Sequence, residues 1–268
     1  MNYKSITLRV LQEQFDLTVD RLFEGGALGT EVLEEGEEVL FKVYVPANFT
    51  LPQGLERYVL SESELEERDW NSEWKKYYRP VRVSERIWVV PFWEKGKFKE
   101  PEGSVVIYIY PGRGFGTGTH ETTRLVMRFL EEILKPGVSF LDVGTGSGIL
   151  SILAKKLGAE KVVACDVQEG VDEEVERNAE LSGVSGIEFV QGSVDRVSGT
   201  FNVVAANIEK HLLTPLLEEI YRKTEEFAVF SGILKVQREE FLKELERVGF
   251  KPVSERGEGE WIAFLCRK

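Results

Sequence analysis

The sequence predicts an α/β protein whose main domain is a doubly wound, mostly parallel sheet that ends in an antiparallel hairpin. From residue 119 to residue 247, strand-like runs alternate with helical segments of about ten to fifteen residues, the pattern of successive β–α units. The last two runs, FKPVSERG and EWIAFLCRK, follow one another without a helix and predict the hairpin. The N-terminal segment shows a separate strand–helix–strand pattern and predicts a small α+β domain.

Length and composition agree with one large domain and one small domain. The chain has 268 residues, of which 42% are hydrophobic, and no apolar run approaches the ~20 residues that span a bilayer. Its start lacks the apolar block and cleavage site of a secretory signal. The two cysteines, Cys165 and Cys266, each lie in an apolar run and are expected to be buried. We therefore expect a cytoplasmic protein that does not associate with membranes.

The net charge of the chain indicates which class of partner it can bind. Its formal net charge is -12. Tight binding to a nucleic-acid backbone depends on clustered Lys and Arg, so we expect no direct sequence-specific contact with nucleic acid. A basic protein partner suits an acidic chain better. We expect a monomer that acts on such a partner.

The small domain is predicted over residues 1–58. Strands are expected at residues 3–11, 29–35 and 38–47, and a helix after the first strand ends at Gly25 and Gly26. This α+β unit, of the ferredoxin-like kind, is large enough to bind a partner but too small to hold much catalytic machinery. Residues 59–72 are expected to form a helical linker, because Ser61 and Glu64 have the spacing of a capping box.

The main domain is predicted over residues 73–268. Strands at 85–94 and 103–114 lead into a glycine-threonine turn, GRGFGTGTHETT. The elements that follow are helices at 119–134, 148–157, 169–182, 211–224 and 236–247, and strands at 138–144, 161–167, 187–193, 201–208, 227–234, 250–257 and 260–268. With right-handed crossovers, the carboxyl ends of the parallel strands meet at one edge of the sheet, where such folds bind ligands.

A second glycine turn, FLDVGTGSG, predicts a ligand site at that edge. It contains Gly144, Gly146 and Gly148, which let the backbone approach a ligand. Ile149 stands where a dinucleotide fingerprint needs its third glycine, and this spacing excludes a nicotinamide dehydrogenase. Asp166 ends the next strand some twenty residues further on, where a carboxylate can bind ribose hydroxyls. A tight strand-to-helix turn without a ligand is the plainer alternative.

A second carboxylate near the turn restricts the class of ligand that the site can bind. Asp142 lies two residues before Gly144, and its charge disfavours a pyrophosphate and suits a cationic amino group. S-adenosylmethionine has an ammonium, a sulfonium and a ribose and so fits both acids. An equally open alternative is that Asp142 braces the neighbouring turn. With only His120 and His211 as histidines and no C-x-x-C motif, we expect no metal site.

Several segments together resemble a known family. They are DWNSEWKKYYRPVRVSERIWVVPFWE, GRGFGTGTHETT, FLDVGTGSGILSILAKKLGAEKVVACDV, VVAANI and FSGIL, in this order from about Asp69 to the C-terminus. They are similar to the ribosomal protein L11 methyltransferases of the PrmA type. A G-x-G-x-G turn is common among class I methyltransferases, whereas FGTGTH-x-TT together with ANI and SGIL is far more specific.

The resemblance implies a fold, a cofactor and a substrate. Residues 73–268 would form a Rossmann-like class I methyltransferase domain that uses S-adenosylmethionine. The protein would be an N-methyltransferase that modifies amino groups of ribosomal protein L11, free or on the large subunit, at lysine side chains, at the N-terminal α-amine or at both. Residues 1–58 would recognise this substrate. Methylation of another protein or of a small-molecule amine, and a cofactor-binding module without catalysis, stay open as alternatives.

The resemblance also implies site residues. Family positions that contact the cofactor fall on Thr123, Gly144, Asp166 and Asn207. The other cofactor-binding candidates lie in the two glycine turns and are Phe115, Thr117, Gly118, Asp142, Gly146 and Gly148. The acid and proline that usually follow the ribose-binding acid are replaced here by residues 167–170, VQEG, which leaves the packing of the adenosine open.

Asn207 is the leading catalytic candidate. Its side-chain carbonyl can accept an N–H hydrogen bond and orient the lone pair of an amine. The ANI motif differs from the NPPY turn that methyltransferases of planar amino groups carry. Because a lysine amine is mostly protonated at neutral pH, we expect it to lose its proton to solvent, without a dedicated general base. His120 is the rival base. A structural cap at Asn207 and a turn-bonding role for His120 are the plainer alternatives.

Overall fold

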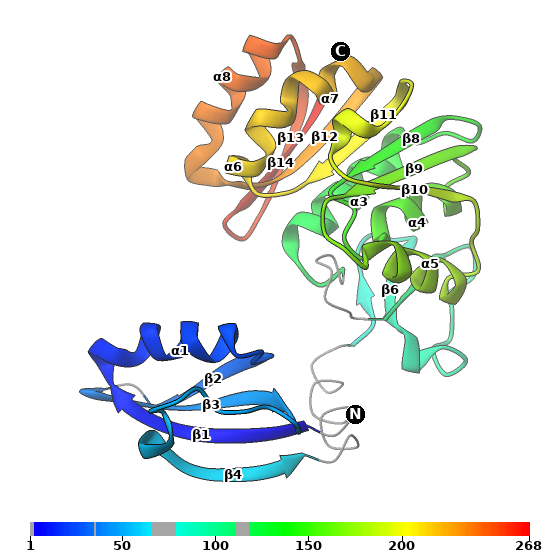
Figure 1. The fold of residues 1–268 in the computed structure, drawn as a ribbon. Helices are drawn as coiled ribbons and strands as arrows, with labels where there is room; N and C mark the ends of the chain where they lie inside the picture. The colour runs from blue at the N-terminus through cyan, green and yellow to red at the C-terminus, as the bar shows by residue number, and fades with distance from the viewer. Residues whose placement is uncertain (1–2, 35, 66–78, 111–117) are drawn as a thin grey trace. The chain divides into compact units, whose positions relative to one another are not determined.

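The computed structural model describes residues 3–34, 36–65, 79–110 and 118–268. The chain divides into two compact units, Met1–Arg79 and Pro80–Lys268 (Figure 1). Each unit has its own sheet and its own hydrophobic core. The division falls a few residues beyond the predicted linker.

The first unit is an antiparallel sheet covered by one helix in its described part. Its elements are β1 (Tyr3–Leu11), α1 (Phe15–Glu24), β2 (Gly29–Glu34), β3 (Glu38–Pro46) and β4 (Val59–Leu65), with the strand order β2-β3-β1-β4. Alternate side chains of β1 and β3, such as Ile6, Leu8 and Phe41, are buried beneath α1, as the period of a strand requires. The order is that of a ferredoxin-like fold. A loop with the short 3₁₀ turn Glu56–Tyr58 stands where that fold has its second helix.

The helix expected from Ser61 is wrong over the described residues. Ser61 and Glu64 lie in β4, where they pair with Thr7 and Lys4 of β1. A capping box is a local signal, whereas pairing with the exposed edge of β1 satisfies a whole row of backbone groups. The remainder of the predicted linker, residues 66–72, lies outside the described residues.

The second unit contains the predicted doubly wound sheet. Its strands are β8 (Ser139–Val143), β9 (Lys161–Asp166), β10 (Ile187–Gln191), β11 (Phe201–Asn207), β12 (Thr224–Leu234), β13 (Lys251–Glu258) and β14 (Trp261–Arg267). They are ordered β10-β9-β8-β11-β12-β14-β13. The neighbours from β10 to β12 are parallel, and β14 is antiparallel to both β12 and β13. The chain leaves β8 in one direction and returns at β11 in the other, so the topological switch point lies between these strands.

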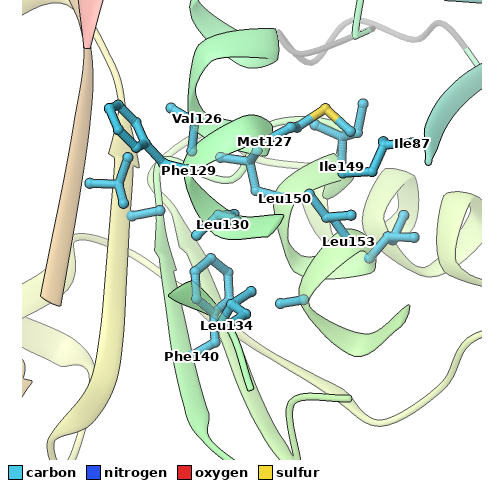
Figure 2. Close-up of a cluster of buried hydrophobic side chains, with 14 of the residues drawn as sticks. Ile87, Val126, Met127, Phe129, Leu130, Leu134, Phe140, Ile149, Leu150 and Leu153 are labelled. Atoms are coloured by element: carbon cyan, nitrogen blue, oxygen red, sulfur yellow. The ribbon is translucent and has the colours of Figure 1, made fainter. Parts of the chain in front are cut away.

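Helices cover both faces of this sheet. On one face lie α3 (Glu121–Ile133), α4 (Ile149–Lys156) and α5 (Val171–Leu181), and on the other lie α6 (Lys210–Leu213), α7 (Leu217–Lys223) and α8 (Arg238–Val248). Figure 2 shows part of the first layer, where Leu130 of α3 and Leu134 just after this helix lie next to Phe140 of β8. The close packing of these side chains fixes the helix N-termini at the carboxyl edge of the sheet.

A small third sheet precedes the main one in the chain. It consists of β5 (Val81–Arg82), β6 (Ile87–Pro91) and β7 (Val105–Ile109), and β6 and β7 are parallel. β7 contacts α4 and α5, so it lies beside the helix layer rather than within the large sheet. In the described part of the chain, no helix combines the length and apolar character needed to cross a bilayer.

Candidate functional site

A cavity of about 600 Å³ opens at the carboxyl edge of the large sheet. It is lined mainly by the ends of β8, β9 and β11 and by the loops after β8, β9, β10 and β11, with Gly232 of β12 beside them, and so lies at the switch point between β8 and β11. The predicted site residues that line it are Gly144, Gly146, Asp166, Asn207 and His120. Phe115 and Thr117, also predicted, lie outside the described residues.

The second glycine turn is shaped by contacts that exclude a side chain. Gly144 has φ +70°, and a Cβ there would lie 2.5 Å from Cγ2 of Ile208. Its N–H and that of Thr145 both donate to the carbonyl of Cys165, at 2.9 and 3.1 Å. The turn therefore runs close to the loops after β9 and β11, and only glycine fits at position 144.

Two other predicted glycines have a packing role. A Cβ at Gly148 would lie 3.1 Å from Val175 of α5, and a Cβ at Gly118 would lie 2.6 Å from Val89 of β6. Both have positive φ, and neither lines the cavity described here. That these two glycines contact a cofactor directly stays a prediction. The structure gives them another role, because each lets its own turn lie close to a neighbouring element, α5 for Gly148 and β6 for Gly118.

Asp166 is held with its carboxylate facing the turn. Oδ2 accepts from the N–H of Gly146 at 2.9 Å, and Oδ1 accepts from the N–H of Gln168 at 3.0 Å. Each oxygen of an ionised carboxylate can accept two hydrogen bonds, so each can still accept one more from a ligand. Asp166 is half-buried and lines the cavity, which suits a pair of ribose hydroxyls.

Asp142 is fully buried beneath the turn and does not line the described cavity. Its Oδ2 accepts from Oγ of Thr145 at 2.6 Å and from both N–H and Oγ of Ser151, at 3.2 and 2.8 Å. Burial raises the pKa of Asp142 to about 6, although these hydrogen bonds oppose the shift. The arrangement favours the bracing role, while Oδ1 has no hydrogen-bond partner among the described residues.

Asn207 ends β11 at the wall of the cavity and is 8% exposed. Its Nδ2 donates to Oγ1 of Thr123 in the first turn of α3, at 3.3 Å. Its Oδ1 is buried and has no hydrogen-bond partner within the described part of the chain. A buried amide oxygen costs free energy unless it is satisfied, so this atom is suited to accept a hydrogen bond from a ligand. Thr123 is fully buried and is joined to the site through Asn207.

His120 caps the N-terminus of α3. Its Nδ1 accepts from the N–H of Thr122 at 3.3 Å and lies 2.8 Å from the hydroxyl of the same residue. Its ring packs edge-on against Trp261 with 5.2 Å between ring centroids. Since Nδ1 acts as an acceptor in the cap, the neutral ring carries its proton on Nε2. This arrangement favours the turn-bonding role over that of a general base.

The closing hairpin brings Trp261 to the cavity, a contact that sequence reasoning missed. The turn before Trp261 is tied to α3 by Glu258, which accepts from Nη2 of Arg124 at 2.5 Å and from Nη1 of Arg128 at 2.8 Å. Burial alone would raise the pKa of Glu258, but the two arginines together lower it. The hairpin is thereby held against the helix that carries His120.

Other lining residues were also missed. They are Thr122, Val143, Cys165, Val167, Gln168, Gly192, Ser193, Ile208, Glu209, Leu212, Leu216 and Gly232. Several of them are ordinary apolar or polar residues in strands, helices and loops, with no signal of their own in the sequence. Gly232 had one, since it lies in the SGIL segment: its φ is +86°, and a Cβ there would lie 2.3 Å from the carbonyl oxygen of Ile208. Exposed Val167 and Leu212 add an apolar rim to the cavity.

The fold and the site together define a class of enzyme. A parallel sheet with one antiparallel strand inserted between β12 and β13, a glycine turn after β8 and an acid ending β9 are the features of a class I methyltransferase. A solved structure of ribosomal protein L11 methylase from Lactobacillus delbrueckii subsp. bulgaricus is similar, with a TM-score of 0.67 and 32% identity over 71% of this chain and 100% of that chain.

The family is also shown. The sequence model of the family "Ribosomal protein L11 methyltransferase (PrmA)" matches residues 48–268. The ribosomal protein L11 methyltransferase of Caldanaerobacter subterraneus subsp. tengcongensis is 38% identical over 88% of this chain and 82% of its own length. That of Anoxybacillus flavithermus is 34% identical over 97% of this chain and 90% of its own length. The chain belongs to the ribosomal protein L11 methyltransferase family.

The residues of the cavity fit the expected cofactor, S-adenosylmethionine. Asp166 has one acceptor position left on each carboxylate oxygen for the ribose, and Val167 offers an apolar surface beside it. Gly144 leaves room that any side chain would fill. The buried Oδ1 of Asn207 can accept an N–H. The remaining acceptor positions and the apolar surface therefore suit a nucleoside that also carries an N–H group.

Proposed function

We propose that this protein transfers methyl groups from S-adenosylmethionine to amino groups of ribosomal protein L11, at lysine side chains, at the N-terminal α-amine or at both. Membership of the family supports the reaction class and the substrate. The observation that carries the assignment is that Asp166 and Asn207, which lie far apart in the chain, both line one cavity. One residue is suited to hold a ribose and the other to orient an amine.

The protein would promote methyl transfer mainly by positioning the two reactants. When bound, S-adenosylmethionine supplies a methyl group on a sulfonium, which is an electrophile. The amine has to be held in line with that methyl group in a site from which water is excluded. Asn207 is suited to this task because its Oδ1 is fixed at the end of a buried strand and can accept one N–H of the amine. The nitrogen lone pair is then directed away from Asn207.

The substrate amine also has to lose a proton, and we assign no side chain as its dedicated base. The lone pair of His120 Nδ1 is engaged in capping α3, so His120 is poorly placed to accept a proton from the amine. Among the described residues, groups of at least three His, Cys, Asp and Glu that could hold a metal ion are absent. Deprotonation to solvent before the amine enters the cavity accounts for the reaction without either.

Recognition of ribosomal protein L11 belongs to the first unit in this proposal. The end of α1, the edge strand β2 and the connection between them carry exposed apolar side chains, namely Phe23 (45%), Val32 (43%) and Leu28 (52%) respectively. Exposed apolar groups beside an open strand edge suit a protein partner. The acidic character of the chain suits a basic partner. We propose that the protein acts as a monomer.

Mass spectrometry of purified ribosomal protein L11 after incubation with the protein and S-adenosylmethionine tests the proposal. Mass increases in steps of one methyl group on lysine residues or on the N-terminal amine are expected. The same assay on assembled large subunits shows whether free or bound substrate is preferred. Labelled cofactor in a ribosomal extract serves as the comparison: label on another protein, with none on ribosomal protein L11, would contradict the proposed substrate.

A further inference from the structure

Asn178 of α5 joins the cofactor turn to the end of β7. The residue is 1% exposed. Its Nδ2 donates to the carbonyl of Ser147 at 2.8 Å, and its Oδ1 accepts from the N–H of Tyr110 at 2.8 Å. Because one partner is a backbone acceptor and the other a backbone donor, the orientation of the amide is determined. A single buried side chain therefore connects two segments that lie far apart in the chain.

The contact fixes one peptide group of the turn at both ends. The carbonyl of the Ser147–Gly148 peptide accepts from Asn178, and its N–H donates to the carbonyl of Thr145 at 3.0 Å. Three residues earlier on the same helix, Val175 packs against Gly148, where a Cβ would lie within 3.1 Å. The face of α5 that carries Val175 and Asn178 thus presses on the part of the turn that follows Gly146, whose N–H orients Asp166.

Gly118, a described residue of the other glycine turn, lies close to the same place. Gly118, with φ +78°, lies so close to Ile149 that a Cβ would be 3.0 Å from its Cδ1. Ile149 begins α4 directly after Gly148. Tyr110, which precedes the first glycine turn, and Gly118, which lies in it, are therefore both held beside the second turn. Asn178 supplies the hydrogen bonds of this connection, and the close contact between Gly118 and Ile149 supplies the packing.

We propose that Asn178 is a positioning residue for the cofactor, which acts by holding the Ser147–Gly148 peptide in the geometry that the site needs. The inference rests on the proposed function for the identity of the ligand. Asn178 does not line the cavity, so its effect passes through the turn. It acts on cofactor affinity and on the KM for S-adenosylmethionine, and leaves kcat at saturating cofactor little changed.

Ser182 provides a matched control on the same helix. It lies four residues after Asn178, is 5% exposed and also bonds to β7, since its hydroxyl donates to the carbonyl of Tyr108 and accepts from its N–H, both at 2.9 Å. Ser182 does not contact the glycine turn through any of these bonds. Its loss also removes two buried hydrogen bonds, but both of them join it to β7 and neither reaches the site.

The experiment compares binding of S-adenosylhomocysteine by calorimetry in the full chain carrying Asn178→Ala, Asn178→Asp or Ser182→Ala. Both alanine variants should lower the melting temperature. Asn178→Ala should weaken binding about tenfold or more, the effect of one buried hydrogen bond, whereas Ser182→Ala should stay within about twofold. Asn178→Asp keeps the acceptor for Tyr110 but cannot donate to Ser147, so it should bind as weakly as Asn178→Ala.

Equal affinity in Asn178→Asp and the wild type would overturn the inference, and this arm decides the question even where Asn178→Ala does not fold. Equal losses of affinity in Asn178→Ala and Ser182→Ala would overturn it as well, since the effect would then follow stability. A wild-type protein that does not bind S-adenosylhomocysteine would contradict the proposed function and this inference with it. The two failures are therefore distinguishable.

Discussion

At the residue scale, Asp166 and Asp142 show how the surroundings of a carboxylate determine its role. Asp166 is half-buried, faces the cavity and has acceptor capacity left. Asp142 is fully buried, and its Oδ2 accepts hydrogen bonds from Thr145 in the turn and from Ser151. The first is suited to a ligand and the second to bracing the loop that the ligand needs.

The pH dependence of stability tests this view of Asp142. Burial raises its pKa in the folded state from 3.8 to about 6, so its favourable contribution is complete below pH 3.8 and is lost as the pH rises through 6. Asp142→Asn removes this titration. The free energy of unfolding of the variant, relative to wild type, should rise by up to about 3 kcal/mol between pH 4 and pH 7. Urea unfolding at a series of pH values measures it.

The control for this experiment is Asp195→Asn, which removes an exposed carboxylate from the 3₁₀ turn after β10. A trend of the same size in both variants would assign the effect to the loss of any negative charge. A difference between Asp142→Asn and wild type that is constant with pH would contradict the assigned shift.

Asn207 makes a second prediction at this scale. Asn207→Ala removes the acceptor proposed for the amine, and kcat for methylation of ribosomal protein L11 should fall about tenfold to a hundredfold. Initial rates at saturating cofactor measure the change, with cofactor affinity determined separately. Turnover and cofactor affinity that both match wild type would contradict the proposed role.

Asn202→Ala is the matched control for Asn207→Ala. Asn202 lies at the opposite end of β11, where its Oδ1 accepts from the N–H of Ser139 at 2.9 Å and its Nδ2 donates to Glu225 at 3.0 Å. Its loss should reduce stability and leave the rate of methyl transfer unchanged, because these bonds are far along the strand from the cavity.

At the element scale, the close approach between β12 and the loop after β11 depends on one glycine. Gly232→Ala would place a Cβ 2.3 Å from the carbonyl oxygen of Ile208, in a left-handed backbone conformation. The expected loss in the free energy of unfolding is about 3 kcal/mol or more, the sum of backbone strain and overpacking. Denaturant unfolding of the variant measures it.

Gly170→Ala separates the two contributions. Gly170 has a similar φ of +81° at the start of α5, but no atom of the described residues beyond its chain neighbours lies within 4 Å of a Cβ built there. Only the conformational penalty of about 1–2 kcal/mol should appear. If both variants lost the same free energy of unfolding, the loop after β11 would have moved away from the new methyl group at Gly232 at no energetic cost. That result would contradict the overpacking contribution.

Elements also show where local signals fail. The helix expected from Ser61 became β4, because the edge of β1 offers backbone partners that a local capping pattern cannot outweigh. The alternating elements from α3 to β14 match their predicted positions closely, except that the helix predicted over 211–224 is divided into α6 and α7 by the 3₁₀ turn Thr214–Leu216, which contains a proline. Their hydrophobic periods are long and unambiguous, so tertiary contacts reinforce the local preference instead of opposing it.

At the scale of the whole molecule, the two units divide the proposed work. All the described residues of the cavity belong to Pro80–Lys268, which has its own core. A chain that starts at Pro80 should therefore keep its affinity for S-adenosylhomocysteine within about twofold and lose methylation of ribosomal protein L11. Calorimetry and mass spectrometry measure the two effects. Full methylation by the shortened chain would contradict substrate recognition by the first unit.

The sequence by itself determined the β–α order, the strand-to-helix glycine turn and the positions of Asp166 and Asn207 at the ends of their strands. These features follow from periodicity and from spacing along the chain, which are local properties. The same reasoning placed the closing hairpin but gave no sign that Trp261 in it would line the site.

Only the tertiary structure decided which distant residues meet. Trp261 reaches His120 because β14 is inserted beside β12, and Asn178 reaches Ser147 and Tyr110 because α5 packs over both. Strand order and helix packing result from the burial of the whole core at once, so no local pattern encodes these contacts. The two glycine turns are recognisable from the sequence, and the link between them through Asn178 exists only in the folded chain.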